Sequence, residues 1–423
     1  MASITGKRGR LSCCAMLQDV PYIEQFRRSH VVVATLIIVA AAAAAAQQAA
    51  PTCQAASKAG AILAWPAEQR EPYIAALDLF FLTRTVAASR KIHVLDQGRL
   101  LTAFEKSGSR SDAFNRFMAA QRVRGVLVLQ DGKIRLERYV FPHSRTTRWN
   151  SFSVAKSITS TLVGAAIKDG HIHSLDDPVT RYISTLRGSA YDDVTVRQLL
   201  TMTSGVKWNE DYTDVTSDVA RMYAQPPDPG FDMTVSYVRR LPREAPPGTK
   251  WVYKTSETNL VGVLVTEAVH KPLADYLSEK IWRPYGMERN AEWMIDDVGH
   301  EQGGCCLAVT LRDYARFGQF ILDGARINGQ AIVADNWLPE ATRTQVSTGV
   351  DAGSGYGYQW WTRDDGTFEA RGIYGQTVHI DPARRLVVVI NSATEQPIDR
   401  AAGQARQEFL AAVKAELDNE RRP

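Results

Sequence analysis

The sequence lacks the charge pattern of a nucleic-acid-binding protein. No five consecutive residues share one sign of charge, and the 423-residue chain carries a formal net charge of +4. The first 47 residues contribute +3 of this, which leaves +1 for the remainder. A balance this close to neutral excludes nucleic acid as an expected partner. With 45% hydrophobic and 23% charged residues, the composition also excludes a chain that is disordered, collagen-like or coiled-coil throughout.

Cysteine is scarce as well. Of the five cysteines, Cys13 and Cys14 precede an apolar N-terminal run, and Cys53, Cys305 and Cys306 follow it. Three cysteines are too few for a disulfide framework. The adjacent pair can form a vicinal disulfide or bind a soft metal, but two small buried thiols are the favoured interpretation. Since no second group of Cys or His is spaced to complete a site, we expect no metal and no cofactor.

A hydrophobic run near the N-terminus indicates export. Residues 31–46 are apolar except for Thr35, and Arg27 and Arg28 precede them. The run is shorter than the roughly 20 apolar residues of a membrane span, and small residues that suit cleavage follow it. We therefore interpret residues 1–50 as a signal peptide or, alternatively, as a retained N-terminal anchor. The protein is expected to be periplasmic or secreted, with membrane contact through that segment alone.

The first half of the remaining chain contains a hairpin and a helix. Residues 124–140 hold two β-prone runs around Asp131-Gly132, which is a strong hairpin signal. In residues 153–169 apolar side chains recur at helical spacing, which predicts a helix. Residues 171–345 are predicted to be mostly helical and rich in loops, with proline-rich breaks. No internal repeat is present.

The C-terminal part returns to strands. Residues 356–362 are aromatic and β-prone, residues 378–380 and 386–390 flank a tight turn, and residues 399–418 predict a closing amphipathic helix. Strands at both ends with helices between them predict an α+β fold, in which an antiparallel sheet is built from both chain ends around a mostly helical inserted region. The folded domain is expected to span residues 58–420.

A serine and a lysine with catalytic spacing open the expected helix. Ser153 and Lys156 are three residues apart, so the hydroxyl and the amine share one helix face. A nucleophilic serine needs a base, and a desolvated lysine with a lowered pKa can serve. Free N–H groups at the helix start can stabilise an oxyanion. A second copy of the spacing, Ser204 and Lys207, follows a turn-like segment, where the two side chains need not align.

The segments around this serine resemble a known superfamily. They are residues 151–160 (SFSVAKSITS), the Asp-Gly and Asp-Asp-Pro of residues 169–178, and residues 199–205 (LLTMTSG). From about 124 to 391 the chain resembles the serine β-lactamase-related hydrolases, which include class C β-lactamases, penicillin-binding D,D-peptidases, carboxylesterases and aminohexanoate-oligomer hydrolases. The resemblance implies an α/β sandwich of the β-lactamase/penicillin-binding-protein type and acyl-enzyme chemistry.

The resemblance assigns a third catalytic residue to Tyr253. In the superfamily a Tyr-x-Asn stands here, and its tyrosine relays protons between the serine and the leaving group. The alternative is a buried tyrosine that merely satisfies its hydroxyl. Thr255 replaces the usual asparagine, which argues against β-lactam recognition, whereas Glu257-Thr258 is similar to the aminohexanoate-dimer hydrolase branch.

A segment corresponding to the family's Lys-Thr-Gly is also expected. Residues 254–256 (KTS) follow the tyrosine too early, so residues 373–376 (IYGQ) are favoured. There Gly375 lets a ligand approach the backbone, and the N–H of Gln376 would complete an oxyanion hole with that of Ser153. The residues of this segment expected to bind substrate are Tyr374, Gly375 and Gln376.

Further positions bear on the resemblance to this superfamily. Ile373 replaces the family's cationic lysine, which again argues against a β-lactamase, and His379 is expected to be structural. Tyr212 matches a tyrosine that lies over the bound amide in aminohexanoate-dimer hydrolases. The neighbouring Glu210 and Asp211 either attract a substrate ammonium or form a solvated acidic loop. The Gly-rich turn that starts at Gly303 is interpreted as scaffold with access to the pocket.

Taken together, the sequence predicts a serine hydrolase that cleaves a small amide or ester through an acyl-enzyme on Ser153. Lys156 and Tyr253 take up and return the proton. The alternatives are a β-lactamase or D,D-peptidase, and a non-catalytic binding protein that has kept the fold. The oligomeric state is left open.

Overall fold

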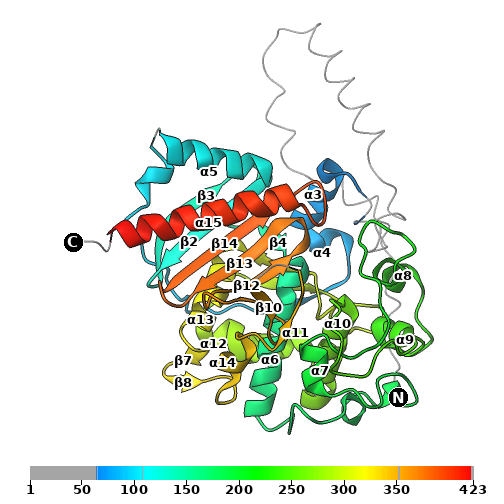
Figure 1. Ribbon diagram of the computed structural model, residues 1–423. Coiled ribbons are helices and arrows are strands. Elements are labelled where there is room, and N and C mark those ends of the chain that lie inside the picture. The colour runs from blue at the N-terminus through cyan, green and yellow to red at the C-terminus, as the bar shows by residue number, and fades with distance from the viewer. Residues whose placement is uncertain (1–62, 64, 107, 351–352, 421–423) are drawn as a thin grey trace, which may run out of the picture. The chain divides into compact units, whose positions relative to one another are not determined.

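The computed structural model describes residues 63, 65–106, 108–350 and 353–420, which belong to one compact unit, Ala59–Pro423 (Figure 1). The expected leader, residues 1–50, lies outside the described residues, as does Cys53. Within the described part of the chain, no helix is long and apolar enough to cross a membrane.

The larger sheet joins the two ends of this unit. It has eight strands in the order β3-β2-β14-β13-β12-β11-β10-β9, and all of its pairings are antiparallel. β2 and β3 form the predicted hairpin, and β2 also pairs with β14, so the predicted sheet from both chain ends is confirmed. The strands are β2 (Val123–Gln130), β3 (Lys133–Tyr139), β9 (Val346–Ser347), β10 (Ser354–Tyr356), β11 (Trp361–Arg363), β12 (Phe368–Gly372), β13 (Gln376–Asp381) and β14 (Leu386–Ser392).

Two details of the strands were not predicted. Residues 356–362 are not one strand, because the chain reverses at Gln359 (φ 64°) and β10 and β11 form a short hairpin there. The inserted region also holds strands of a second, four-stranded sheet, in the order β1-β5-β6-β4. These strands and the remaining two-stranded pair are β1 (Thr83–Val86), β4 (Arg148–Asn150), β5 (Ala291–Met294), β6 (Leu307–Thr310), β7 (Arg326–Ile327) and β8 (Gln330–Ala331).

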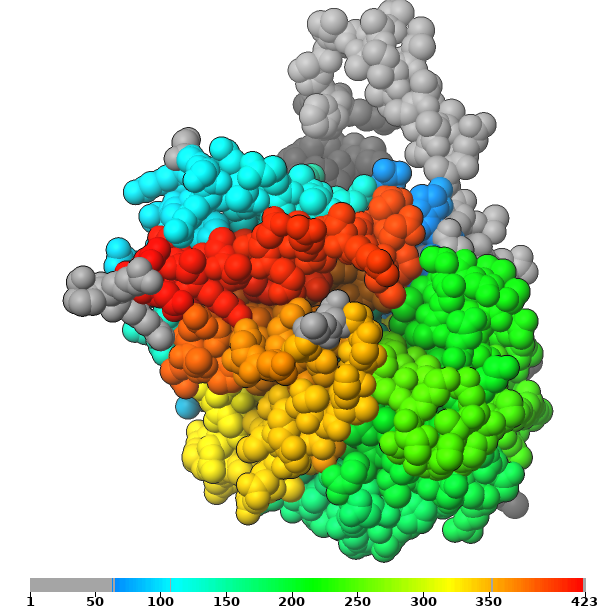
Figure 2. Space-filling view, viewed as in Figure 1, coloured from blue at the N-terminus to red at the C-terminus, as the bar shows by residue number. Residues whose placement is uncertain are grey.

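Helices cover both faces of the larger sheet (Figure 1). On one face α5 and α15 lie side by side, as Figure 2 also shows, and Phe117 stacks on Phe409 between them at 4.4 Å. On the other face α13 packs on β14 and β2, and α6 and α10 lie beyond it. The α-helices are α3 (Ala67–Ala75), α4 (Leu77–Phe80), α5 (Ser109–Ala120), α6 (Ala155–Lys168), α7 (Val196–Leu200), α8 (Asp218–Ala224), α9 (Met233–Val238), α10 (Thr255–Val269), α11 (Leu273–Leu277), α12 (Arg283–Tyr285), α13 (Leu311–Leu322), α14 (Trp337–Ala341) and α15 (Arg400–Glu420).

The predicted helix at 153–169 is confirmed as α6, which runs through the interior. Twelve of its fourteen residues are buried, including serines and threonines. Most of their hydroxyls donate to backbone carbonyls of other segments: Ser157 Oγ to Gln359 O and Thr159 Oγ1 to Gly303 O, each at 2.7 Å, while Thr161 Oγ1 donates to Ser157 O within the helix. Buried hydroxyls that all find acceptors fix the position of a helix instead of destabilising it. α6 is thereby held against the turn at Gln359 and against the 303–306 turn, whose cysteines line the site.

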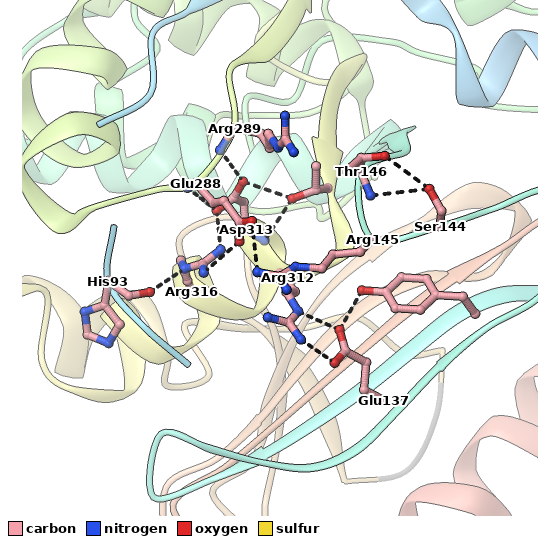
Figure 3. Close-up of polar contacts among 12 residues, drawn as sticks. His93, Glu137, Ser144, Arg145, Thr146, Glu288, Arg289, Arg312, Asp313 and Arg316 are labelled. Atoms are coloured by element: carbon pink, nitrogen blue, oxygen red, sulfur yellow. Dashed lines mark hydrogen bonds and ion pairs between the residues drawn. The ribbon is translucent and has the colours of Figure 1, made fainter. Parts of the chain in front are cut away.

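A network of charges fixes the start of α13 (Figure 3). The buried carboxylate of Asp313 accepts the backbone N–H of Glu288 at 2.7 Å and pairs with Arg316 at 2.8 Å. Arg316 in turn reaches the Glu288 carboxylate at 3.0 Å, and Arg312 makes a bidentate contact with Glu137 on β3 at 2.7 and 2.6 Å. Because bidentate and buried pairs hold their geometry, α13 has a fixed register on the sheet.

The close packing of α13 on the larger sheet can be tested by a substitution at Gly318. A Cβ at this position would lie 2.5 Å from Cγ1 of Val387 on β14. Gly318→Ala is therefore expected to destabilise the protein by about 1–3 kcal/mol, measured by urea denaturation. In α15, Gly403 has no atom within 4 Å of the same position, so Gly403→Ala should stabilise the protein by about 0.5–1 kcal/mol. Equal stability of Gly318→Ala and the unchanged protein would contradict the close packing.

Candidate active site

Ser153 lies in a short turn that leads into α6. A 3₁₀ turn (Phe152–Val154) precedes the helix, and the left-handed backbone of Phe152 (φ 42°) sets the turn's direction. Asn150 Oδ1 accepts the Phe152 N–H at 3.0 Å. A non-glycine residue in this conformation costs free energy and persists where the surroundings enforce it. The turn leaves Ser153 7% exposed, at the edge of a depression.

Lys156 directs its amine at this serine. Its Nζ hydrogen-bonds Ser153 Oγ at 3.2 Å, Thr255 Oγ1 at 3.1 Å and the Gly304 carbonyl at 2.6 Å. The side chain is buried, and desolvation of its charged form lowers the pKa of Lys156 to about 7. The charge of Glu210 acts in the opposite direction and raises that pKa. Near neutral pH a substantial fraction of the amine is therefore unprotonated and able to accept a proton.

Tyr253 completes the group. Its hydroxyl hydrogen-bonds Ser153, and its ring centroid lies 5.2 Å from Lys156 Nζ. Burial raises the pKa of Tyr253, while the hydrogen bond with Ser153 lowers it. The ring packs parallel to Trp361 at 5.6 Å, so its orientation is fixed. The structure thus brings together the three side chains that the sequence singled out.

A half-buried carboxylate, that of Glu210, supports this group from behind. Thr255 donates to Glu210 through both its hydroxyl and its backbone N–H, the latter at 3.0 Å. The Tyr212 hydroxyl donates to Glu210 at 2.6 Å, and so does the Trp208 indole. Glu210 therefore links the loop that carries Trp208 and Tyr212 to the start of α10. Asp211, next to it, is fully exposed and accepts hydrogen bonds within its own turn. The sequence showed both acids but not this difference between them.

The second pair with this spacing, Ser204 and Lys207, does not form a similar site. Ser204 is buried and contacts Lys254, whose Nζ is 3.2 Å away, and Glu257, while Lys207 is exposed. Lys254 and Glu257 form a buried pair at 3.0 Å. Because Lys254 lies between Tyr253 and Thr255, this pair anchors the backbone that carries both. Its role in the site was not predicted.

The structure places residues 374–376 outside the lining of the depression beside Ser153, and their substrate contacts stay a prediction. The side chain of Gln376 is buried, with Oε1 accepting from the Trp149 indole at 2.9 Å and Nε2 donating to Ser392 O at 2.6 Å. Tyr374 is buried under the Arg70 guanidinium, which lies 3.7 Å from its ring centroid. A Cβ on Gly375 would lie 2.2 Å from Ser392 Oγ. Tyr374, Gly375 and Gln376 are absent from the lining of the depression, since left-handed backbone at 374 and 375 turns this segment inward.

Ile373 and Gly372 occupy the place expected of those residues. Ile373 lines the depression together with Ser153. A Cβ on Gly372 would lie 2.6 Å from Ser151 O and 3.1 Å from Ser153 N, so this backbone passes directly against the serine. His379, further along β13, is buried and bonds Glu369 at 2.8 Å, away from the depression.

Beside Ser153 lies a depression of about 530 Å³, open solvent included. Tyr212 lines it, as predicted. The lining residues are Leu63, Leu77, Phe81, Asn150, Phe152, Ser153, Tyr212, Val219, Tyr223, Thr255, Met294, Cys305, Cys306 and Ile373.

Cys305 and Cys306 form a disulfide, with an S–S distance of 2.04 Å, so the expectation of two free thiols was wrong. The left-handed backbone at Cys306 (φ 68°) accompanies the approach of the two neighbouring side chains. The turn is the predicted scaffold, and it also lines the depression. Among the described residues, no group of three or more His, Cys, Asp or Glu side chains could hold a metal ion.

The fold and the site together define a serine hydrolase in which a lysine and a tyrosine side chain lie beside the nucleophile. The family described as Beta-lactamase matches residues 111–413, and the chain belongs to that family. It is 28% identical over 312 residues to a 6-aminohexanoate-dimer hydrolase of Paenarthrobacter ureafaciens, covering 69% of this chain and 78% of the relative. It is 25% identical over 180 residues to a β-lactamase of Pseudomonas fluorescens, covering 40% and 46%.

Solved structures show the same fold. A structure described as a 6-aminohexanoate-dimer hydrolase from Bacillus anthracis matches with a TM-score of 0.72 and 23% identity, over 83% of this chain and 95% of that one. A class C β-lactamase matches with a TM-score of 0.55 and 17% identity, over 71% and 94%. The predicted α+β sandwich of the β-lactamase and penicillin-binding-protein type is confirmed.

The effect of the Glu210 charge on the pKa of Lys156 can be tested by mutation. Because that charge raises the pKa, Glu210→Gln is expected to move it below about 7. The measurement is an NMR titration of protein labelled with ¹³Cε-lysine, with Lys156→Arg to assign the signal. Asp211→Asn, which removes an exposed acid one residue away, is the matched control and should leave the midpoint in place. An unchanged or higher midpoint in Glu210→Gln would contradict the electrostatic coupling.

Proposed function

We propose that this protein hydrolyses a small amide or ester through an acyl-enzyme on Ser153. The observation that carries the proposal is the buried amine of Lys156, 3.2 Å from Ser153 Oγ, with its pKa lowered to about 7. A substantial fraction of such an amine is unprotonated at neutral pH, and the neutral amine is a base able to accept the serine proton.

In acylation, Ser153 Oγ attacks the carbonyl carbon while its proton passes to the Lys156 amine. The backbone N–H of Ser153 donates to the resulting oxyanion. For the second donor we propose the N–H of Ile373 in place of that of Gln376, because Ile373 lines the depression and Gly372 packs against the Ser153 backbone.

The leaving group departs with a proton from Tyr253. Burial raises the pKa of this phenol, so the group is protonated at neutral pH and acts as a donor. As the C–N or C–O bond breaks, Tyr253 protonates the leaving atom, and the phenolate regains a proton from the neighbouring Lys156 ammonium, whose Nζ lies 5.2 Å from the Tyr253 ring centroid. In deacylation a water molecule loses its proton to the same pair, attacks the acyl carbon and releases the acid with Ser153 restored.

Similarity favours linear amides of the 6-aminohexanoate kind, since two of the matched proteins carry that name. A second point bears on β-lactams. Among the described residues that line the depression there is no cationic side chain to receive a carboxylate, and Ile373 stands where the family's lysine is expected. A β-lactamase or D,D-peptidase activity therefore has less support.

Export belongs to the proposal as well. The apolar run at 31–46, which lies outside the described residues, is typical of a secretory signal or anchor. The Cys305–Cys306 disulfide supports an oxidising compartment, the periplasm or the exterior, because disulfides are rare in the cytoplasm.

The nucleophile is tested with a fluorophosphonate. Incubation of the purified protein is expected to add one phosphonyl group, seen in the intact mass, and Ser153→Ala is expected to add none and to have no turnover. Far-UV circular dichroism checks that the variant is folded. Absence of an adduct in folded, unchanged protein would favour the non-catalytic binding protein.

The role of Tyr253 is tested by changing the leaving group. Tyr253→Phe is expected to lower kcat/KM for a p-nitroanilide by about 10²- to 10⁴-fold, because an amine must be protonated to leave. For the p-nitrophenyl ester of the same acid, whose phenolate leaves without a proton, the loss should be at least about tenfold smaller. Equal losses for both substrates would contradict the assignment of Tyr253 as the acid for the leaving group.

A further inference from the structure

The depression beside Ser153 offers few polar groups to a ligand. None of its described lining residues carries a charge. The hydroxyls of Tyr212 and Thr255 are already donated to Glu210, and Asn150 Oδ1 accepts the N–H of Phe152. The Ser153 hydroxyl, at the edge of the depression, is the nucleophile and therefore does not serve as a binding group. Apart from the Asn150 amide nitrogen and the hydroxyl oxygens, the side-chain lining that remains for a substrate consists of carbon and sulfur atoms.

The hydroxyl of Tyr223, another polar group in the lining of the depression, also has partners. The Tyr223 hydroxyl lies 3.4 Å from Cys305 Sγ and hydrogen-bonds Asn259. Burial raises the pKa of Tyr223, so the phenol stays uncharged. Around it stand Leu77 and Met294, which form one apolar cluster with Cys305. Among the side chains that line this part of the depression there is no carboxylate, and the hydroxyl oxygen of Tyr223 is an uncharged acceptor; the charges of Glu210 and Asp232 act on Tyr223 from outside the lining.

The depression corresponds to the acyl side of the substrate. The leaving group has to reach the Tyr253 hydroxyl, yet Tyr253 is not among the described lining residues. Its ring instead belongs to an aromatic cluster with Trp251 and Trp361. Since both halves of the substrate meet at the carbonyl that Ser153 attacks, the half without access to Tyr253 is the acyl group.

The Cys305–Cys306 disulfide is the fixed part of this wall. A disulfide has no S–H donor and cannot ionise, so it presents a polarisable, apolar surface. Its backbone is held by the Trp293 indole, which donates to Cys305 O at 3.1 Å, and by Met294 N, which donates to Cys306 O at 3.0 Å. The preceding carbonyl, Gly304 O, accepts from Lys156. The acyl wall and the base are therefore parts of one continuous turn.

We propose that the substrates of this protein carry an uncharged, apolar acyl group, which packs against the Cys305–Cys306 disulfide. This inference rests on the proposed acyl-enzyme function and departs from the 6-aminohexanoate relatives, whose named acyl group ends in an amine. Moving an ammonium ion into a site without a partner is strongly unfavourable, whereas burial of methylene groups is favourable.

The test compares two esters that differ at one atom of the acyl chain. p-Nitrophenyl hexanoate and p-nitrophenyl 6-aminohexanoate have the same leaving group and chain length, and their rates are divided by those of alkaline hydrolysis. The hexanoyl ester is expected to have a kcat/KM about 100-fold higher or more. Equal or faster turnover of the aminohexanoyl ester would overturn the inference while the hydrolase function stands. Failure of both esters, together with no fluorophosphonate adduct, would overturn both.

The disulfide is tested by reducing it in the same protein. Phosphine reduction to two thiols is expected to lower the ratio of hexanoyl to acetyl kcat/KM about tenfold, comparable to losing two buried methylene groups, and reoxidation should restore it. Cys305→Ser/Cys306→Ser is the matched control, with a low ratio that the phosphine does not change. A ratio that stays high after reduction, confirmed by mass, would show that the disulfide does not contact the acyl chain.

Discussion

The chemistry of this site depends on a lysine amine held out of water. Solvation favours the charged form of lysine, and its loss shifts Lys156 toward the neutral form near physiological pH. Burial alone would lower the basicity of the amine further, but Glu210 acts against it. The site therefore balances one desolvated cation against one carboxylate that is itself satisfied by four donors from Trp208, Tyr212 and Thr255.

The fold supplies that balance by bringing two distant segments to one helix. α6 carries the amine, with the nucleophile in the turn before it; the start of α10 carries Thr255, and the 303–306 turn supplies the carbonyl that accepts from Lys156. The Thr159 hydroxyl also bonds the 303–306 turn, so the helix that follows the serine helps to position the groups around it. A displacement of any of these segments changes the environment of the amine.

Sequence reasoning succeeded where local spacing decides geometry. Ser153 and Lys156 meet because one helical turn separates them, and the hairpin at Asp131-Gly132 forms because that turn matches the twist of its strands. It failed where tertiary packing decides. The inward turn at 374–376 follows from backbone conformations that its sequence does not require, and the disulfide at 305–306 depends on a left-handed residue that composition does not reveal. Glu210 and Asp211 look alike in sequence and differ in their neighbours.

The pairing of β2 with β14 has a consequence for how the chain folds. Val126 lies opposite Ile390, so this part of the larger sheet joins residues separated by most of the domain. A chain that is still being synthesised cannot close this sheet until its last strand has emerged, and contacts of such long range slow folding. The nucleophile, just before α6, and the segment that packs against its backbone, Gly372, are also far apart in the sequence and lie near opposite ends of that interval. The contact that encloses the nucleophile is therefore a late event, which waits until most of the domain has been synthesised.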